Sequence, residues 1–164
     1  MNADRPLTGA ERDAVAALRE KARVLYEGKQ VAHRSCGIAL AETFALPTRP
    51  YQALRGGGIT GEGPCGAVQA GRLILGETFG DPDPAGAVTP TLRAAIGHYE
   101  AEIARRLGEA QRGSCKSLTG RFPVFQSEPR AAFCTDIAAA VAEVLAETIA
   151  RFGGALPAAP LPAR

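Results

Sequence analysis

Apolar side chains recur every three or four positions along much of the chain, which is the spacing of one face of an α-helix. A segment starting near residue 89 has the clearest pattern, with an apolar face formed by Leu92, Ile96, Tyr99, Ile103 and Leu107. A second periodic segment runs from Pro129 to the glycines at 153–154, and its inner stripe comprises Ile137, Val141, Val144, Leu145 and Ile149. No stretch alternates over several residues as a strand would. The pattern therefore predicts an all-α fold, a compact bundle of about five helices.

Capping and turn residues set the boundaries of the other predicted helices. Thr8 and Glu11 have the spacing of a capping box, which opens a helix over 8–28 that Gly28 ends. Serine and proline at favoured first-turn positions, followed by apolar residues, predict shorter helices at 35–46, 64–79 and 114–120. Residues 47–63 are predicted to be irregular and end in a glycine-rich loop.

The length of 164 residues suits one domain. We expect a single helical domain over 1–154, followed by a mobile Pro/Ala-rich tail at 155–164. Hydrophobic residues make up 46% of the chain, yet aromatics only 5%, and 32 residues are alanine. This small-residue content favours closely packed helices.

Charge and targeting signals narrow the possible partners and the compartment. The formal net charge is only +2, which argues against nucleic acid or an acidic membrane as the main partner. Charged residues at the amino terminus precede no apolar stretch, so no secretory signal is expected. The apolar run 131–150 contains Asp136, Glu143 and Glu147 and is not expected to span a membrane. We therefore expect a cytoplasmic protein.

Four cysteines carry the candidate chemistry: Cys36, Cys65, Cys115 and Cys134, separated by 29, 50 and 19 residues. No Cys-x-x-Cys motif occurs, which excludes a thioredoxin-like motif, a zinc ribbon and covalent attachment of haem. Thiols in the cytosol stay reduced unless they are catalytic, redox-sensing or bound to metal. A site built from these thiols must therefore be assembled by tertiary structure.

Three of the cysteines follow a serine or a proline at a predicted helix start: Cys36, Cys65 and Cys115. Unsatisfied amides and the positive end of the helix dipole favour a thiolate there, by roughly 1 kcal/mol each. Cys134 lies a little further into its helix. The alternative is that cysteine acts as a small apolar residue in an alanine-rich core.

The glycine-rich loop allows three interpretations. Gly56, Gly58 and Gly61 match Gly-x-Gly-x-x-Gly, but the preceding residues contain two prolines and do not predict the strand that a dinucleotide site requires. The loop is then either a flexible linker or a backbone that wraps closely around a thiol-bound cofactor and points amides at its sulfurs. In the second case Gly57 and Gly58 are candidate cofactor-binding residues.

Only two histidines are available as ligands or bases. His33 precedes Cys36 by three residues and is a candidate for the same site, whereas His98 is predicted at a surface or core-edge position in mid-helix. Neither is tied to a second acid–base group, so the sequence predicts no hydrolase site. The sequence also lacks the repeated Glu-x-x-His pairs that a di-iron carboxylate bundle requires, so it does not predict a di-iron site.

The cysteine segments resemble those of the C-GCAxxG-C-C family of redox-active proteins. The similarity covers about residues 30–150, and it rests on the order and context of four segments: Ser-Cys36-Gly, the triple glycine ending at Gly58 before Pro-Cys65-Gly-Ala, Gly-Ser-Cys115-Lys, and Phe-Cys134. The chain departs from the family motif at Pro64 and Gln69, where that motif has glycine. The resemblance implies a small helical redox protein related to the iron–sulfur module of split-Soret cytochromes, without the haem part, and it makes the four cysteines candidate ligands.

Three hypotheses follow. The first is a redox or electron-transfer protein that binds an iron–sulfur cluster through the four cysteines, with [2Fe–2S] favoured over [4Fe–4S] although four thiolates suit both. The second is a metal-free thiol–disulfide relay, and the third is a non-catalytic interaction module in which the thiols hold zinc or fill the core. The first two require a redox partner protein. A homodimer remains open, and no reaction is assigned.

Overall fold

The computed structural model describes residues 3–163, without the side chains of residues 109–112. Its elements are α1 (Gly9–Glu27), α2 (Cys36–Thr43), the 3₁₀-helix η1 (Arg49–Leu54), α3 (Gly66–Phe79), α4 (Pro90–Arg112), α5 (Cys115–Thr119) and α6 (Glu128–Arg151). Within the described residues no strand forms, and a single isolated bridge joins Pro64 to Ser114. The predicted all-α fold is confirmed.

The first helix has both of the predicted ends. The Glu11 amide donates to the Thr8 hydroxyl at 3.2 Å, and the Thr8 amide donates to the Glu11 carboxylate at 2.8 Å, which completes the capping box. Gly28 ends the helix in the left-handed conformation, with φ 73°. Local signals were sufficient here because caps act within one turn.

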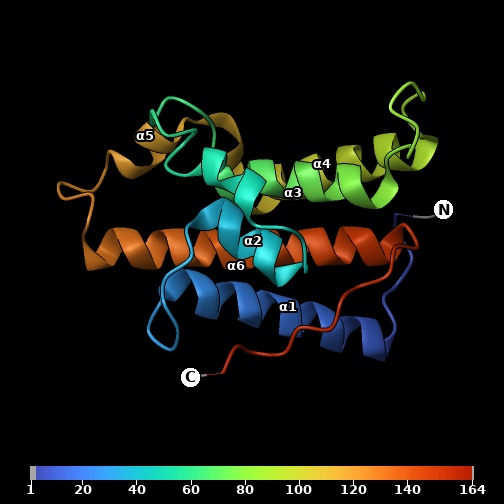
Figure 1. Ribbon diagram of the computed structural model, residues 1–164, viewed down its shortest axis with the longest axis horizontal. Coiled ribbons are helices and arrows are strands. Elements are labelled where there is room, and N and C mark those ends of the chain that lie inside the picture. The colour runs from blue at the N-terminus through green and yellow to red at the C-terminus, as the bar shows by residue number, and fades with distance from the viewer. Residues whose placement is uncertain (1–2, 164) are drawn as a thin grey trace.

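Helix α6 forms the centre of the molecule (Figure 1). It packs against α1 on one side and against α3 and α4 on the other, and α2 also contacts it. Its alanines let these neighbours approach closely; Ala138, Ala142 and Ala146 are fully buried. Such small side chains leave room for helices on several sides of one helix. Buried residues of all the long helices form one hydrophobic core.

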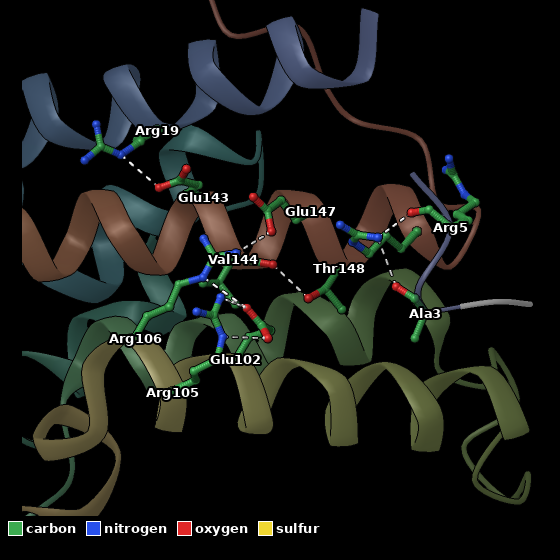
Figure 2. A network of polar contacts seen from close by, with 11 residues as sticks. Ala3, Arg5, Arg19, Glu102, Arg105, Arg106, Glu143, Val144, Glu147 and Thr148 are labelled. Atoms are coloured by element: carbon green, nitrogen blue, oxygen red, sulfur yellow. Dashed lines mark hydrogen bonds and ion pairs between the residues drawn. The ribbon is translucent and has the colours of Figure 1, made fainter. Parts of the chain in front are cut away.

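Ion pairs tie the outer helices to α6 (Figure 2). Arg106 of α4 contacts Glu147 of α6 at 2.7 Å, and Arg19 of α1 contacts Glu143 of α6 at 3.0 Å. Glu102 accepts hydrogen bonds from Arg106 and from Arg105. Glu143 and Glu147 of α6 therefore serve helix packing. No helix in the described chain is long and apolar enough to cross a membrane.

Two expectations need correction, and one long helix departs from regular geometry. Residues 49–54 form a 3₁₀-helix inside the stretch predicted to be irregular, since Pro50 suits its first turn. Helix α4 is kinked at Leu107, where φ is −136°. The tail was expected to be mobile, yet it runs back along α1 (Figure 1), and the apolar residues Leu156 and Ala159 pack against the core.

Candidate functional site

Each cysteine comes from a different helix. Cys36 is the first residue of α2, Cys65 is the N-cap of α3, and Cys115 is the first residue of α5. Cys134 lies in the second turn of α6. The predicted positions at three helix starts are confirmed.

All four cysteines line one cavity of about 390 Å³. The remaining wall is mainly apolar and comes from α1, the segment before α2, the glycine-rich loop, the first turn of α3, α5, the segment before α6 and α6 itself. Its polar and charged members are Tyr26, His33, Ser35, Arg55, Thr119, Gln126 and Arg130. The four thiols are free. Across the described part of the chain, no three His, Cys, Asp or Glu side chains form a group that could hold a single metal ion.

Burial has the largest effect on the pKa values of Cys36, Cys65 and Cys115. It raises the pKa of Cys36 and Cys115, and it raises the pKa of Cys65 to about 12. The amides of Val68 and Ala67 oppose this shift at Cys65, and the amide of Gly37 opposes it at Cys36. The expectation that helix starts favour thiolates is thus correct in direction, but desolvation outweighs the effect. In the metal-free protein, Cys65 is a neutral thiol at physiological pH.

Cys115 receives even less help from its helix. The amide of Cys115 donates to the Gly63 carbonyl at 2.8 Å, and the amide of Lys116 donates to the Gly61 carbonyl at 2.9 Å. Amides at a helix start are expected to be unsatisfied, but here carbonyl groups of the glycine-rich loop accept their hydrogen bonds. Burial, and then the Cys134 thiol, raise the pKa of Cys115. The guanidinium of Arg130 has a smaller effect and lowers this pKa.

The glycine-rich loop is built around Cys115. A Cβ atom on Gly57 would lie 2.5 Å from the Cys115 Cβ, so this position has no space for a side chain. Gly56 lines the cavity, whereas neither Gly57 nor Gly58 is among its lining residues, and a Cβ atom on Gly58 would have the Ala53 carbonyl oxygen as its nearest contact, at 4.0 Å. On the other side, a Cβ on Gly66 would lie 2.6 Å from the Cys36 sulfur. The structure thus places Gly57 against a cysteine and Gly58 away from all four.

Sequence reasoning missed a polar group on the cavity wall. Arg130 donates to the hydroxyl of Tyr26 at 3.2 Å, and this hydroxyl interacts with the thiol of Cys134. Burial, followed by Cys134, raises the pKa of Tyr26, which keeps the phenol protonated. Ser35 also faces the cavity, and its buried hydroxyl has no hydrogen-bond partner among the described residues. A serine at a helix start predicts a cap, but this side chain makes no capping bond.

The histidines behave as predicted. His33 lines the cavity, and its Nδ1 is hydrogen-bonded to the Tyr26 carbonyl oxygen. Because a carbonyl oxygen can only accept, Nδ1 is the donor in this bond. His98 lies at the edge of the core, 5.8 Å from the Phe152 ring, and burial lowers its pKa.

Comparisons of the chain with protein-family models, with curated proteins and with solved structures found no match. The resemblance of the four cysteine segments to a redox family therefore stays a prediction. The chemistry open to the site follows from its own residues: four thiols, one phenol, one imidazole and two guanidinium groups around an apolar cavity.

Proposed function

We propose that this is a small redox or electron-transfer protein whose four cysteines hold an iron–sulfur cluster in the cavity. One observation carries the proposal: Cys36, Cys65, Cys115 and Cys134 come from four helices and line the same cavity. Four thiolates complete the ligand set of a [2Fe–2S] or a [4Fe–4S] cluster, and we propose the [2Fe–2S] form. The order of the cysteine segments, which resembles the C-GCAxxG-C-C family, supports the same function.

The residues around the thiols suit such a group. Amides of Ala67 and Val68 are directed at the Cys65 sulfur, and the unpartnered Ser35 hydroxyl is a further donor at the cavity wall. Hydrogen bonds of this kind stabilise sulfur ligands and tune a cluster's potential. Arg130 supplies positive charge to balance anionic thiolates. The wall is mainly apolar, which limits the water around the ligands, although Cys36, Cys115 and Cys134 are partly exposed.

When bound, an iron–sulfur cluster accepts and donates single electrons. The cysteine thiols must lose their protons before the sulfur atoms can act as ligands. Burial opposes that loss at Cys36, Cys65 and Cys115, so ligand binding depends on the metal to stabilise the thiolates. The same burial disfavours a metal-free thiol–disulfide relay, because the thiolate is the form that attacks a disulfide.

Anaerobic purification followed by ultraviolet–visible spectroscopy, with iron and zinc quantified on the same sample, tests the proposal. We expect visible absorbance that dithionite bleaches and two irons per chain, whereas four irons would identify the [4Fe–4S] form. Serine in place of any one cysteine should abolish or strongly change the chromophore. Gln126→Ala, which alters the same cavity wall without removing a sulfur, is the matched control and should keep it.

Other results would assign the site differently. About one zinc per chain without visible absorbance would identify a structural zinc site. A colourless, metal-free protein whose thiol count falls on mild oxidation and recovers with a reductant would identify a thiol–disulfide relay. Retention of the chromophore in three of the four cysteine variants would exclude the proposed ligand set.

A further inference from the structure

Three exposed apolar side chains lie in the two chain segments that border the cysteine cavity. Phe125 lines the cavity and is 54% exposed, its neighbour Val124 is 61% exposed, and Ile59 on the glycine-rich loop is 69% exposed. Two segments carry these residues, 55–63 and 113–130, and the bonds of Cys115 and Lys116 to the loop join them. We call the exposed surface of these two segments the mouth face; it includes the glycine-rich loop and α5 at one end of the molecule (Figure 1).

Ile59 is held out by a strained backbone. Its φ is 72°, and it follows three glycines whose φ values are also positive. Its amide donates to the Arg55 carbonyl at 2.6 Å, which closes a left-handed turn. A β-branched residue rarely adopts this conformation, because its side chain crowds the backbone. The side chain is exposed, so no burial of apolar surface compensates for the strain. A role at the surface accounts better for the strained conformation.

The two arginines on the cavity wall are bonded to neutral groups. Arg55 donates to the Gln52 side chain at 3.3 Å, and Arg130 donates to the Phe125 carbonyl at 2.6 Å and to Tyr26. Several arginines elsewhere pair with carboxylates, as Arg106 does with Glu147. Among the described residues, the bonds of Arg55 and Arg130 go to no carboxylate, whereas Lys116 of the same face pairs with Glu62 at 3.1 Å.

The mouth face as a whole is cationic. Arg55, Lys116, Arg121 and Arg130 lie in its two segments, together with two carboxylates, Glu62 and Glu128. This excess of two positive charges equals the formal net charge of the whole chain. A second copy of the chain would bring like charges together on this face, whereas an acidic surface would meet opposite charges.

We propose that the mouth face docks an acidic redox protein. The partner's apolar centre would cover Ile59, Val124 and Phe125, and its carboxylates would pair with Arg55 and Arg130. An apolar centre inside a charged rim is the usual anatomy of a transient protein interface. The proposal rests on the proposed function, because a redox site that opens at this face requires a redox partner here.

Binding of two probes tests the proposal: an acidic [2Fe–2S] ferredoxin and an acidic flavodoxin, titrated calorimetrically into the purified protein at low salt. We expect both to bind, with affinity that falls as salt is added. Arg55→Glu and Val124→Ser should each weaken binding about tenfold or more. The matched controls are Arg93→Glu and Leu73→Ser; Leu73 is exposed on α3 away from the cavity, and both variants should stay within about twofold of the wild type.

Iron content, measured on the same samples, separates the two proposals. Normal iron in Val124→Ser together with lost probe binding supports docking at the mouth face. Probe binding that depends on Arg55 in a protein without iron or chromophore supports the docking face and refutes the cluster. Failure of both probes to bind, or equal losses in the control variants, refutes the docking face. Binding to phosphatidylglycerol vesicles but not to the probes would also overturn it, as would a dimer that Val124→Ser dissociates.

Discussion

The hydroxyl of Tyr99 in α4 donates a 3.0 Å hydrogen bond to the carbonyl oxygen of Val68 in α3. Tyr99 is fully buried, and its ring fills the space beside Gly71, one turn further along α3. The first turns of α3 are therefore fixed by a side chain of another helix. Since Cys65 is the N-cap of α3, this contact also helps to position one wall of the cysteine cavity.

Gly71→Ala should destabilise the protein, because the added Cβ atom would overlap the Tyr99 phenol. We expect a loss of about 1 to 3 kcal/mol in the free energy of unfolding, measured by urea denaturation. Gly76→Ala is the matched control in the same helix. No atom lies within 4 Å of the Cβ it would add, so better helix propensity should stabilise the protein by up to about 1 kcal/mol. Equal effects of the two substitutions would contradict the packing argument.

Gly57→Ala should be more harmful than Gly56→Ala. Both glycines have positive φ, so alanine at either position costs roughly 1 kcal/mol of backbone strain. Only Gly57 is packed against Cys115, where the new methyl group would also push the cysteine and the loop apart. We expect a further loss of about 1 to 3 kcal/mol and faster loss of bound metal to a chelator for Gly57→Ala. Identical unfolding curves for the two variants would contradict a destabilising contact between the new methyl group at position 57 and Cys115.

Removing the positive charge of Arg130 should slow the reaction of Cys115 with iodoacetamide in reduced, metal-free protein. Burial and Cys134 raise the Cys115 pKa, and Arg130 lowers it, so Arg130→Gln shifts the pKa further upward. At pH 8 the thiolate fraction, and with it the alkylation rate, should fall severalfold. Mass spectrometry of the labelled peptide measures this rate. Arg19→Gln, which removes a guanidinium paired with Glu143 on another part of the molecule, should leave it unchanged.

Acid should weaken a cluster of ion pairs within α4. Hydrogen bonds from Arg105, and then from Arg106, lower the pKa of Glu102 from 4.5 to about 2. A carboxylate with a depressed folded pKa contributes stability that is complete above pH 4.5 and is lost as the pH falls through about 2. Glu102→Gln should therefore cost about 1 to 2 kcal/mol at pH 7 and flatten the pH dependence of urea unfolding in this window. Glu62→Gln removes an exposed ion pair with Lys116 and should change little.

Much of the helical framework was predictable because its signals are local. The Thr8 capping box, the C-cap at Gly28 and the serine before α5 act within one turn, so the residues themselves mark the helix ends. The 3₁₀-helix at 49–54 was not foreseen although Pro50 suits its first turn, and the kink at Leu107 was not foreseen either. The docking of the tail on the core was missed because its proline and alanine content resembles that of a mobile segment.

The cysteines could be selected from the sequence because free thiols are few and chemically distinctive. The residues that modify them could not. Arg130 and Tyr26 are 104 residues apart, and no spacing rule connects them. Ser35 has the sequence signature of a helix cap, whereas the fold directs it to the cavity without a capping bond. Long-range packing thus decides the polarity of the site, while the sequence identifies its sulfur atoms.

Helix α6 contacts α1, α2, α3 and α4, and it follows all of them in the chain. During synthesis the earlier helices leave the ribosome before the element that covers them, so their apolar faces stay open until residues 128–151 emerge. The fourth cysteine arrives with this same helix. A nascent chain therefore holds three thiols without an enclosing wall, and the cavity that the four cysteines line is complete only after translation has passed α6.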